Sequence, residues 1–287
     1  MANAGMVALN GQKLHYEVHG TGEPLVLIMG IGYDSSLWTL HQVAALARHF
    51  KVVIFDNRDV GRSAPAADFY TIADMADDVA GLLRALNIPH AHVLGLSMGA
   101  LIAQELAVRH AGLVDRLILT GADFAPARRL CHPIAVWNWT KANDANGAIF
   151  GAEQFAWLFS TSFLRNRAAV EQTVSFLSSN PNPILPDAYA RQARAYLEYD
   201  SGDRLAEIDA ATLVMVGEQD LLTPPWVARE VAAAIPGARF HMIEGDGAAH
   251  ALPLERPAEF NEIVIRFLTS ANANLEAAGS GAAAAYP

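Results

Sequence analysis

The amino-acid sequence predicts an α/β fold with a mostly parallel central sheet flanked by helices. Apolar runs of strand length alternate with segments that have the period of amphipathic helices, which is the pattern of successive βαβ units. Hydrophobic residues make up 52% of the 287 residues and charged residues 17%, so the chain has ample apolar material for a large core. A parallel sheet of this kind is buried on both faces, which explains why its strands read as nearly continuous apolar runs.

Seven short segments are expected to form the sheet. The residues of Lys13–Val18 alternate between apolar and polar, which indicates an antiparallel strand at the edge. The parallel strands are predicted at Pro24–Met29, Lys51–Phe55, His92–Leu96, Arg116–Thr120, Thr212–Val216 and Arg239–Ile243.

Four longer segments are expected to be helices that cover the sheet. Thr71 is predicted to cap the first of them, because a threonine hydroxyl can accept a hydrogen bond from a free N–H of the first turn. The second is expected to end near Gly112. The four segments are Ile72–Leu86, Met98–Arg109, Pro225–Ile235 and Pro257–Leu268.

Residues 124–205 interrupt this alternation and are predicted to be a mainly helical insertion, with Pro181, Pro183 and Pro186 as breakers. Half of the aromatic residues of the chain lie in this insertion, and its eight Arg or Lys exceed its seven Asp or Glu by one. The expected organisation is therefore a core of residues 1–123 and 206–270, the insertion, and an Ala-rich C-terminal tail at 271–287 to which no function is assigned.

Charge and composition limit the class of partner. The formal net charge of −10 argues against a nucleic acid or an anionic membrane surface, since both require a basic face. No run approaches the roughly 20 apolar residues of a membrane-spanning helix, and the N-terminus lacks the pattern of a secretory signal. A cytoplasmic protein is expected. Because Cys131 is the single cysteine, a disulfide framework and a cysteine-rich metal site are excluded.

The strongest local motif is Gly95-Leu96-Ser97-Met98-Gly99, which lies between a predicted strand and a predicted helix. A sharp turn at this point lifts a serine hydroxyl above the sheet, and the glycines relieve the crowding. The N–H of Met98, at the start of the helix, is then expected to donate to an oxyanion. The alternative interpretation is a serine that only caps the helix.

A serine nucleophile requires a base that takes its proton, and the order nucleophile, acid, histidine places that base after the last strand. His241 and His250 satisfy this requirement. His241 lies within a predicted strand, whereas His250 follows a loop of small residues that can bend over the sheet. The sequence therefore favours His250 as the general base.

The acid that orients the histidine is expected just after a strand between Ser97 and His250. Asp220 follows the strand at 212–216 and is the predicted acid, with Glu218 and Asp123 as alternatives. The N–H of Ile31, in a glycine-bracketed loop after the first parallel strand, is the predicted second donor to the oxyanion. For this loop the alternative is an ordinary glycine turn.

With these motifs the chain resembles the α/β-hydrolase superfamily over nearly its whole length. The segments that carry the resemblance are Met29–Gly32, Asp56–Ser63, Gly95–Gly99, Gly217–Asp220, Gly247–His250 and Leu254–Pro257. Within the superfamily, Asp56–Ser63 and Gly95–Ala100 look like the corresponding segments of small bacterial esterases of the aclacinomycin methylesterase and 3-oxoadipate enol-lactonase type. The resemblance implies a helical cap inserted after the sixth strand, at residues 124–205, with its aromatic side chains above the pocket.

Two positions depart from many members of this superfamily. Met29 stands where a histidine is common, and Asp59 stands where a glycine is common. The first departure leaves the backbone donor of the loop intact. Arg58 and Asp56 are expected to hold neighbouring loops by ion pairs and hydrogen bonds and to take no part in catalysis.

The predicted activity is hydrolysis of a carboxylic ester or lactone through an acyl-enzyme on Ser97, with no metal and no organic cofactor. Alternatives of the same fold are a carbon–carbon bond hydrolase, a cofactor-free haloperoxidase-like enzyme and a non-catalytic small-molecule receptor. Carbon–carbon hydrolases often carry a Trp soon after the histidine, where this chain has Ala251-Leu252-Pro253. Dehalogenases and epoxide hydrolases use an aspartate at the position of Ser97.

The expected partner is a small, mostly apolar ester or lactone, because an aromatic-rich insertion favours burial of apolar groups. The arginines of the insertion could instead meet a substrate carboxylate, although solvated helix faces are the simpler interpretation. The sequence sets no expectation for the oligomeric state. The arginines concerned are Arg128, Arg129, Arg165, Arg167, Arg191 and Arg194.

Overall fold

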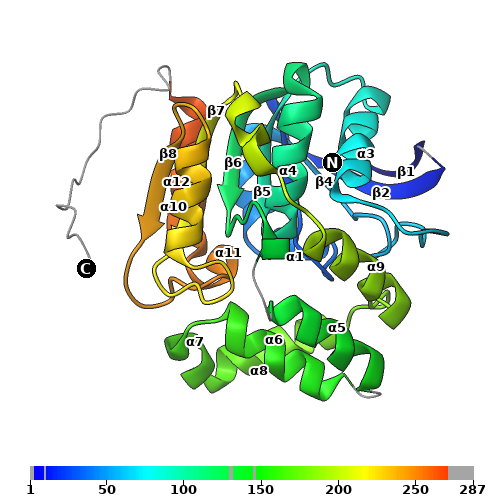
Figure 1. Ribbon diagram of the computed structural model, residues 1–287, viewed down its shortest axis with the longest axis vertical. Coiled ribbons are helices and arrows are strands. Elements are labelled where there is room, and N and C mark those ends of the chain that lie inside the picture. Colours follow the sequence, from blue (N-terminus) through cyan, green and yellow to red (C-terminus); the bar gives the residue numbers. More distant parts are fainter. Residues whose placement is uncertain (1–2, 10, 129–131, 145–146, 271–287) are drawn as a thin grey trace.

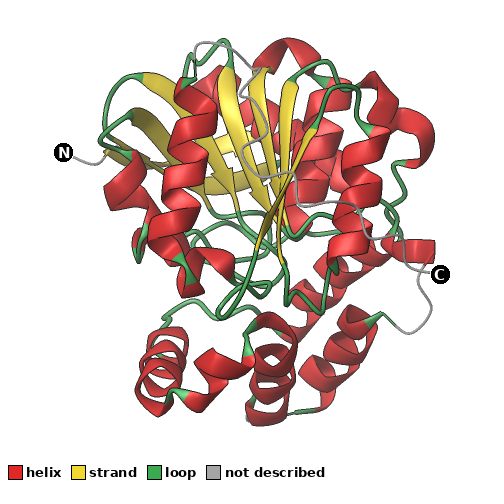
Figure 2. Cartoon of the chain, turned by 90° about the vertical axis from the view of Figure 1, so that its left-hand side faces the viewer, coloured by secondary structure: helices red, strands yellow, loops and turns green. Residues whose placement is uncertain are grey.

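The computed structural model describes residues 3–9, 11–128, 132–144 and 147–270. Within this part of the chain, eight strands form one sheet: β1 Asn3–Leu9, β2 Gln12–His19, β3 Glu23–Ile28, β4 Phe50–Phe55, β5 Ala91–Leu96, β6 Val114–Thr120, β7 Ala211–Gly217 and β8 Arg239–Ile243. Their order across the sheet is β1-β2-β4-β3-β5-β6-β7-β8. The six strands β3 to β8 are parallel to one another, and helices lie on both faces of the sheet (Figures 1 and 2). This confirms the predicted fold class.

The predicted strands are all present, but the sheet has one more strand than the sequence indicated. Lys13–Val18 lies in β2, which is antiparallel to β4 as expected, yet β2 is not the edge because β1 pairs with its other side. The prediction missed β1 because its residues include Asn3, Gly5 and Ala8, which are poor strand formers. A hairpin turn with Gly11 at φ 78° brings β1 back along β2.

The four predicted core helices are observed with small shifts at their ends. They are α3 Ile72–Ala85, α4 Met98–Arg109, α10 Pro225–Ala234 and α12 Pro257–Thr269. Thr71 caps α3 as predicted: its hydroxyl accepts from the Asp74 N–H at 3.2 Å, and the Asp74 carboxylate accepts from the Thr71 N–H at 2.7 Å. Three short helices also belong to the core: α1 Ser36–Thr39, α2 Gln42–Leu46 and α11 Leu252–Glu255.

Alternate side chains of the central strands pack against helices on opposite faces of the sheet. In β3, Val26 and Ile28 join the apolar cluster formed with α3 and α4, whereas Leu25 and Leu27 join the cluster formed with α2 and α12. All four side chains are fully buried. Because both faces are covered, the carboxyl ends of the strands are left as the edge at which a site can form.

The insertion lies next to that edge. Between β6 and β7 it contributes the helices α5 Pro133–Asn143, α6 Ala148–Leu158, α7 Thr161–Arg165, α8 Arg167–Ser178 and α9 Pro186–Leu197. In Figures 1 and 2 helices α5–α8 form a separate layer below the ends of the strands. Cys131 and the C-terminal segment 271–287 lie outside the described residues.

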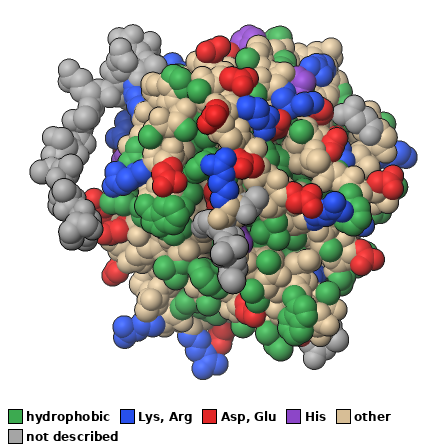
Figure 3. All heavy atoms as spheres, in the orientation of Figure 1, with side chains coloured by type: hydrophobic (Ala, Val, Ile, Leu, Met, Phe, Trp, Pro, Cys, Tyr) green, Lys and Arg blue, Asp and Glu red, His purple; other side chains and the backbone are tan. Residues whose placement is uncertain are grey.

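Charged side chains of both signs lie on the surface of the described residues (Figure 3). On the face shown in Figure 3, acidic and basic side chains are interspersed, and this face has no broad basic surface of the kind that nucleic acids bind. Among the helices that the structure describes, none has both the length and the apolar character needed to cross a lipid bilayer.

Candidate active site

Ser97 occupies the tight turn between β5 and α4. Its backbone is in a strained conformation, with φ 57° and ψ −120°, which is uncommon for a residue with a side chain and is typical of functional sites. The Ser97 N–H donates to the Thr120 carbonyl oxygen at 2.9 Å and so ties the turn to β6. The hydroxyl makes no capping hydrogen bond to α4, which contradicts the interpretation of Ser97 as a simple helix cap.

The glycines around Ser97 are required by close backbone contacts. A Cβ on Gly95 would lie 2.2 Å from the Gly99 oxygen, and a Cβ on Gly99 would lie 2.1 Å from the Ile28 oxygen. These distances are far inside van der Waals contact, so both positions exclude any side chain. The motif therefore reflects the crossing of β3, β5 and α4 at one point.

Asp220 and His250 meet as the sequence predicted. The His250 Nδ1 lies 2.8 Å from the Asp220 Oδ2, and both side chains are buried. Because a carboxylate can only accept, Nδ1 is the donor in this pair, and in the neutral imidazole Nε2 then carries the lone pair. Nε2 is buried and has no hydrogen-bond partner among the described residues.

Asp220 is held in place by its own turn. Its Oδ1 accepts from the N–H groups of Leu222 and Thr223 at 2.9 and 2.8 Å, and its Oδ2 accepts from the Thr223 hydroxyl at 2.9 Å as well as from His250. The ring of His250 lies against Gly121, where a Cβ would come within 2.7 Å of the ring carbon Cε1. These four hydrogen bonds and the contact with Gly121 fix the Asp220 carboxylate and the His250 imidazole.

The alternative residues of the sequence analysis lie elsewhere. The Glu218 side chain is exposed and accepts from the Gly245 N–H, and the Asp123 carboxylate accepts from the N–H groups of Phe124 and Ala125. His241 lies in β8 as expected, where burial and the charge of Arg266 lower its pKa. None of the three lines the pocket that contains Ser97.

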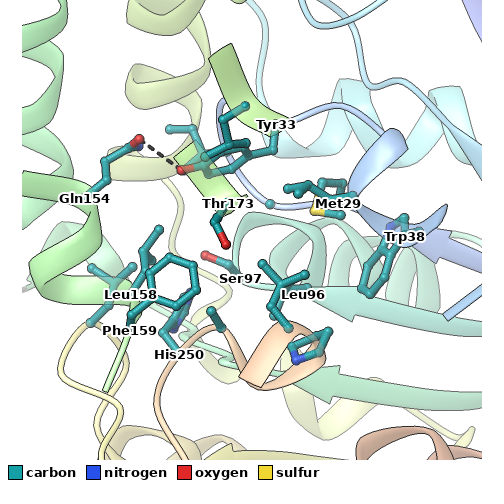
Figure 4. A pocket seen from close by; sticks show the side chains of 18 of the residues that line it. Met29, Tyr33, Trp38, Leu96, Ser97, Gln154, Leu158, Phe159, Thr173 and His250 are labelled. Atoms are coloured by element: carbon teal, nitrogen blue, oxygen red, sulfur yellow. Dashed lines mark hydrogen bonds between the residues drawn. The ribbon is translucent and has the colours of Figure 1, made fainter. Parts of the chain in front are cut away.

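Ser97 and His250 line one pocket at the carboxyl edge of the sheet (Figure 4). The two side chains are not hydrogen-bonded to each other in this structure. Catalytic hydrogen bonds are commonly longer before substrate binds, so their position in one pocket is compatible with proton transfer. Asp220 lies behind His250, and the three predicted residues are thus brought together from three separate turns.

The loop after β3 lies against Ser97. A Cβ on Gly30 would be 3.2 Å from the Ser97 Cβ, which shows how closely this backbone passes. Ile31 follows in the loop and lines the pocket, while Met98 follows Ser97 at the first turn of α4. The Gly32 N–H donates to the Gln192 side chain at 2.8 Å, so α9 of the insertion helps to fix this loop.

The rest of the pocket is largely apolar and has a cavity volume of about 70 Å³. No Arg or Lys is among its described lining residues. The apolar side chains that line it include Met29, Leu37, Trp38, Leu96, Trp137, Leu158, Phe159, Leu177, Leu222 and Leu254.

Polar side chains of the lining were missed by sequence reasoning. The Tyr33 hydroxyl donates to the Gln154 side chain at 3.0 Å and so joins the core to α6 across the pocket. Burial raises the pKa of Tyr33, which keeps this phenol protonated. Figure 4 shows the Thr173 hydroxyl of α8 directed into the pocket toward Ser97. These residues belong to no motif, and their meeting depends on how the insertion packs on the core.

The insertion is also fastened to the segment that carries His250. The Ala251 N–H donates to the Leu158 carbonyl at 2.9 Å, and the Ser160 N–H donates to the Glu255 carboxylate at 3.1 Å. The Ser160 hydroxyl donates to the same carboxylate. Burial raises the pKa of Glu255, and the bonds from Ser160 oppose that shift.

Arg58 holds its loop by an ion pair as expected, but with a partner that the sequence did not identify. Asp59, for which the sequence set no such expectation, also forms an ion pair. Arg191 of α9 forms a two-bond ion pair with Asp59, at 2.8 and 2.6 Å, and Tyr70 donates to the same carboxylate. Arg58 pairs with Asp78 at 2.7 Å. Three other arginines singled out in the insertion form ion pairs at its surface: Arg128 with Asp200, Arg167 with Glu171 and Arg194 with Glu198, while Arg129 lies outside the described residues.

Asp56 is a fully buried carboxylate that organises the same region of the core. Its Oδ1 accepts from the N–H and hydroxyl of Ser35, and its Oδ2 accepts from the Arg62 N–H at 2.9 Å. These contacts agree with the structural role predicted for it.

Comparison with known proteins identifies the family. A family model described as the alpha/beta hydrolase fold matches residues 23–257. A Mycobacterium tuberculosis protein named as a non-heme bromoperoxidase, BpoC, is 32% identical over 264 residues, which cover 91% of this chain and 99% of that protein. A Caulobacter protein named as a carbamate hydrolase, RutD, is 29% identical over 265 residues, or 89% of this chain and 96% of that protein.

Solved structures agree with this assignment. The enol-lactonase of Burkholderia xenovorans is similar with a TM-score of 0.80 at 30% identity, and the match covers 93% of this chain and 100% of that one. A thermophilic esterase of Thermogutta terrifontis has a TM-score of 0.80 at 27% identity, with 93% and 98% of the two chains covered. The chain belongs to the alpha/beta hydrolase fold family.

Proposed function

We propose that this protein is a serine hydrolase that cleaves a small carboxylic ester or lactone through an acyl-enzyme. The observation that carries the proposal is the strained Ser97 in one pocket with His250, whose Nδ1 is held by Asp220 at 2.8 Å. A serine at a strand-to-helix turn, a histidine with its far nitrogen free and a buried carboxylate behind it are the parts of a nucleophile with its base.

In the proposed reaction the Ser97 oxygen attacks the carbonyl carbon while His250 Nε2 takes the hydroxyl proton. Asp220 stabilises the imidazolium that results, and the N–H groups of Ile31 and Met98 are proposed to donate to the oxyanion. The imidazolium then gives its proton to the leaving alcohol oxygen, which breaks the carbon–oxygen bond. A water molecule repeats the cycle on the acyl-enzyme, and the acid is released.

The pocket supports an uncharged and mostly apolar substrate, as its lining is apolar and lacks cationic side chains among the described residues. We propose that the insertion acts as a cap over this pocket, since Trp137, Gln154, Phe159 and Thr173 all line it. Closing the pocket in this way would exclude water and strengthen the hydrogen bonds to the oxyanion. No metal or organic cofactor takes part in the proposed reaction.

Hydrolysis of p-nitrophenyl acetate and butyrate tests the proposal directly. The wild-type protein should release p-nitrophenol with a burst or steady turnover, and Ser97→Ala should lower kcat/KM by at least about a thousandfold. Ser175→Ala, which removes an exposed hydroxyl of α8, is the matched control and should leave the rate unchanged. Equal rates for Ser97→Ala and wild type would reject Ser97 as the nucleophile, and a folded wild type without any turnover would favour the receptor alternative.

A further inference from the structure

Two buried polar atoms of the pocket take no part in the mechanism above. Trp38 Nε1 and Gln42 Oε1 are both buried and have no hydrogen-bond partner among the described residues, although Trp38 is 1% and Gln42 0% exposed. Both residues line the pocket that contains Ser97. A buried polar group without a partner costs roughly 1–3 kcal/mol, so native structures seldom retain one without a reason.

The two atoms are chemically complementary, and their residues are close in the chain and line the same pocket. Trp38 is in α1, and Gln42 is the first residue of α2, four positions later in the chain. The indole nitrogen can only donate, and the Gln42 oxygen can only accept. The Gln42 Nε2 already donates to the Pro253 carbonyl at 2.9 Å, which fixes the amide and identifies its unpartnered atom as the oxygen.

The part of the pocket that these groups line is otherwise apolar: Met29, Leu37 and Leu96 belong to it, and we call it the arm of the pocket. Figure 4 shows Met29 and Leu96 between Ser97 and Trp38, so the arm leads away from the nucleophile along apolar side chains before it reaches the indole. A purely hydrocarbon substrate group would cover this end and leave both polar atoms without partners. A group that accepts from Trp38 and donates to Gln42 would satisfy them both.

We propose that Trp38 and Gln42 form a polar subsite for a substrate whose group in this arm ends in a carboxamide or hydroxyl. The inference rests on the proposed function, because it assigns the specificity of that same pocket. A carboxamide has the carbonyl oxygen and N–H that the two side chains require, and a hydroxyl has both in one atom. Trp38 and Gln42 would then be specificity-determining residues, distinct from the groups that perform the reaction.

Binding of small ligands to the Ser97→Ala protein tests the subsite without any turnover. Butanamide and pentan-2-one have the same shape and heavy-atom count and both accept a hydrogen bond, but only the amide donates one. The indole N–H signals of the protein labelled with ¹⁵N-tryptophan report binding, and Trp38→Phe identifies the signal of Trp38. We expect butanamide to bind about tenfold more tightly than pentan-2-one and to shift the Trp38 signal downfield.

Two variants and a control decide the outcome. Gln42→Met should remove the preference for butanamide, and Trp38→Phe should weaken binding of both ligands about tenfold. Trp137→Phe makes the same chemical change at the side of the pocket formed by the insertion and should keep the preference. Thermal unfolding and near-ultraviolet circular dichroism establish that each variant is folded. If Gln42→Met does not fold, Trp38→Phe alone is used to test the subsite.

Equal affinities for the two ligands, with a Trp38 signal that does not move, would overturn the subsite and indicate a bound water only. This outcome is separate from a failure of the proposed function. Loss of the proposed function would appear as an unreactive Ser97 in the ester assay, whereas the ligand titration depends on binding alone.

Discussion

At the scale of single residues, the carboxylate of Asp220 shows how the site is pre-organised. Two backbone N–H groups and the Thr223 hydroxyl occupy three of its acceptor positions, and the fourth faces His250 Nδ1. Such a carboxylate has one orientation, so the imidazole also has one. The lone pair of Nε2 is therefore directed by groups that never touch the substrate.

Replacing Asp220 by Asn should lower kcat by about 10⁴-fold while the fold is retained. An amide at this position can donate to Nδ1 and would favour the tautomer with its proton on Nε2, which cannot accept the proton of Ser97. Steady-state hydrolysis of p-nitrophenyl butyrate measures the effect. Glu218→Gln is the control, because that exposed carboxylate lies two residues away and does not contact His250, and it should change kcat less than twofold. Similar losses in both variants would contradict the assignment of the acid.

Thr173 offers a second test at this scale. Its hydroxyl faces the pocket from α8, and no other residue of the described structure forms a hydrogen bond with it. If it contacts the bound ester, Thr173→Val should raise KM by about fivefold, since one hydrogen bond is worth on the order of 1 kcal/mol. Thr161→Val, at the start of α7, is an exposed control. An unchanged KM for several esters would remove Thr173 from substrate recognition.

At the scale of the secondary-structure elements, the crossing of β3, β5 and α4 determines where Ser97 lies. The Gly99 Cα is so close to the Ile28 carbonyl that a methyl group would lie 2.1 Å from its oxygen. The same close contact therefore determines both the position of Ser97 and the packing of α4 against β3.

Gly99→Ala should destabilise the protein by about 1–3 kcal/mol or more and abolish activity, because backbone must move to admit the methyl group. Gly151→Ala is the matched control: this glycine lies within α6, a methyl group on its Cα would have no neighbouring atom within 4 Å, and the variant should gain up to about 1 kcal/mol. Chemical denaturation of both variants measures the difference. A Gly99→Ala protein as stable as wild type would refute the steric argument.

The ion pair between Arg191 and Asp59 joins α9 of the insertion to the core. The Asp59 side chain is fully buried and that of Arg191 is 17% exposed, so removal of the arginine leaves a buried carboxylate without its cation. Arg191→Met should lower the free energy of unfolding by on the order of 3 kcal/mol. Arg167→Met removes an ion pair whose arginine side chain is 90% exposed, and it should change the free energy of unfolding by less than about 0.5 kcal/mol. Equal effects on urea denaturation would contradict the proposed connection.

The elements also show what the sequence could and could not predict. The central parallel strands were predictable because each is a largely buried apolar run, and the turn at Ser97 was predictable because its glycines mark a close backbone crossing. β1 was missed because its pairing with β2 depends on the hairpin and not on its own residues. Asp59 appeared only as a departure from relatives, and its partner Arg191 lies 132 positions away. Such a contact has no local signature.

At the scale of the whole molecule, the buried His15 and the half-buried His241 link stability to pH. Burial, together with the charge of Arg62, lowers the pKa of His15 below its ordinary value of 6.5, and burial with Arg266 lowers the pKa of His241. The unfolded chain therefore takes up protons at these positions before the folded protein does. The free energy of unfolding should fall as the pH falls below about 6.5.

Urea denaturation at pH values between about 7 and 5.5 measures this dependence, and His241→Gln should make the fall smaller. His90 is a control of opposite sign, because its hydrogen bond to the Asp115 carboxylate raises its pKa. Its stabilising effect is present at low pH and is lost as the pH rises, so His90→Gln should make the fall steeper. Identical pH profiles for wild type and His241→Gln would exclude this histidine as a source of the dependence.

The arrangement of the insertion on the core explains why the pocket lining was harder to predict than Ser97, Asp220 and His250. Ser97, Asp220 and His250 follow strands whose carboxyl ends share one edge, so their proximity follows from the topology. Tyr33, Gln154 and Thr173 meet only because helices of the insertion pack on the core in one particular way. Helical periodicity indicates which segments are helices, but it does not determine how five helices are arranged.

Reaction with a fluorophosphonate, followed by mass spectrometry of the digested protein, determines whether Ser97 is the activated nucleophile. We expect one stoichiometric adduct on the peptide that contains Ser97, formed at least about a hundredfold more slowly in His250→Ala and absent from Ser97→Ala. A folded protein that remains unmodified, or an adduct on another residue with Ser97 free, would contradict this role of Ser97.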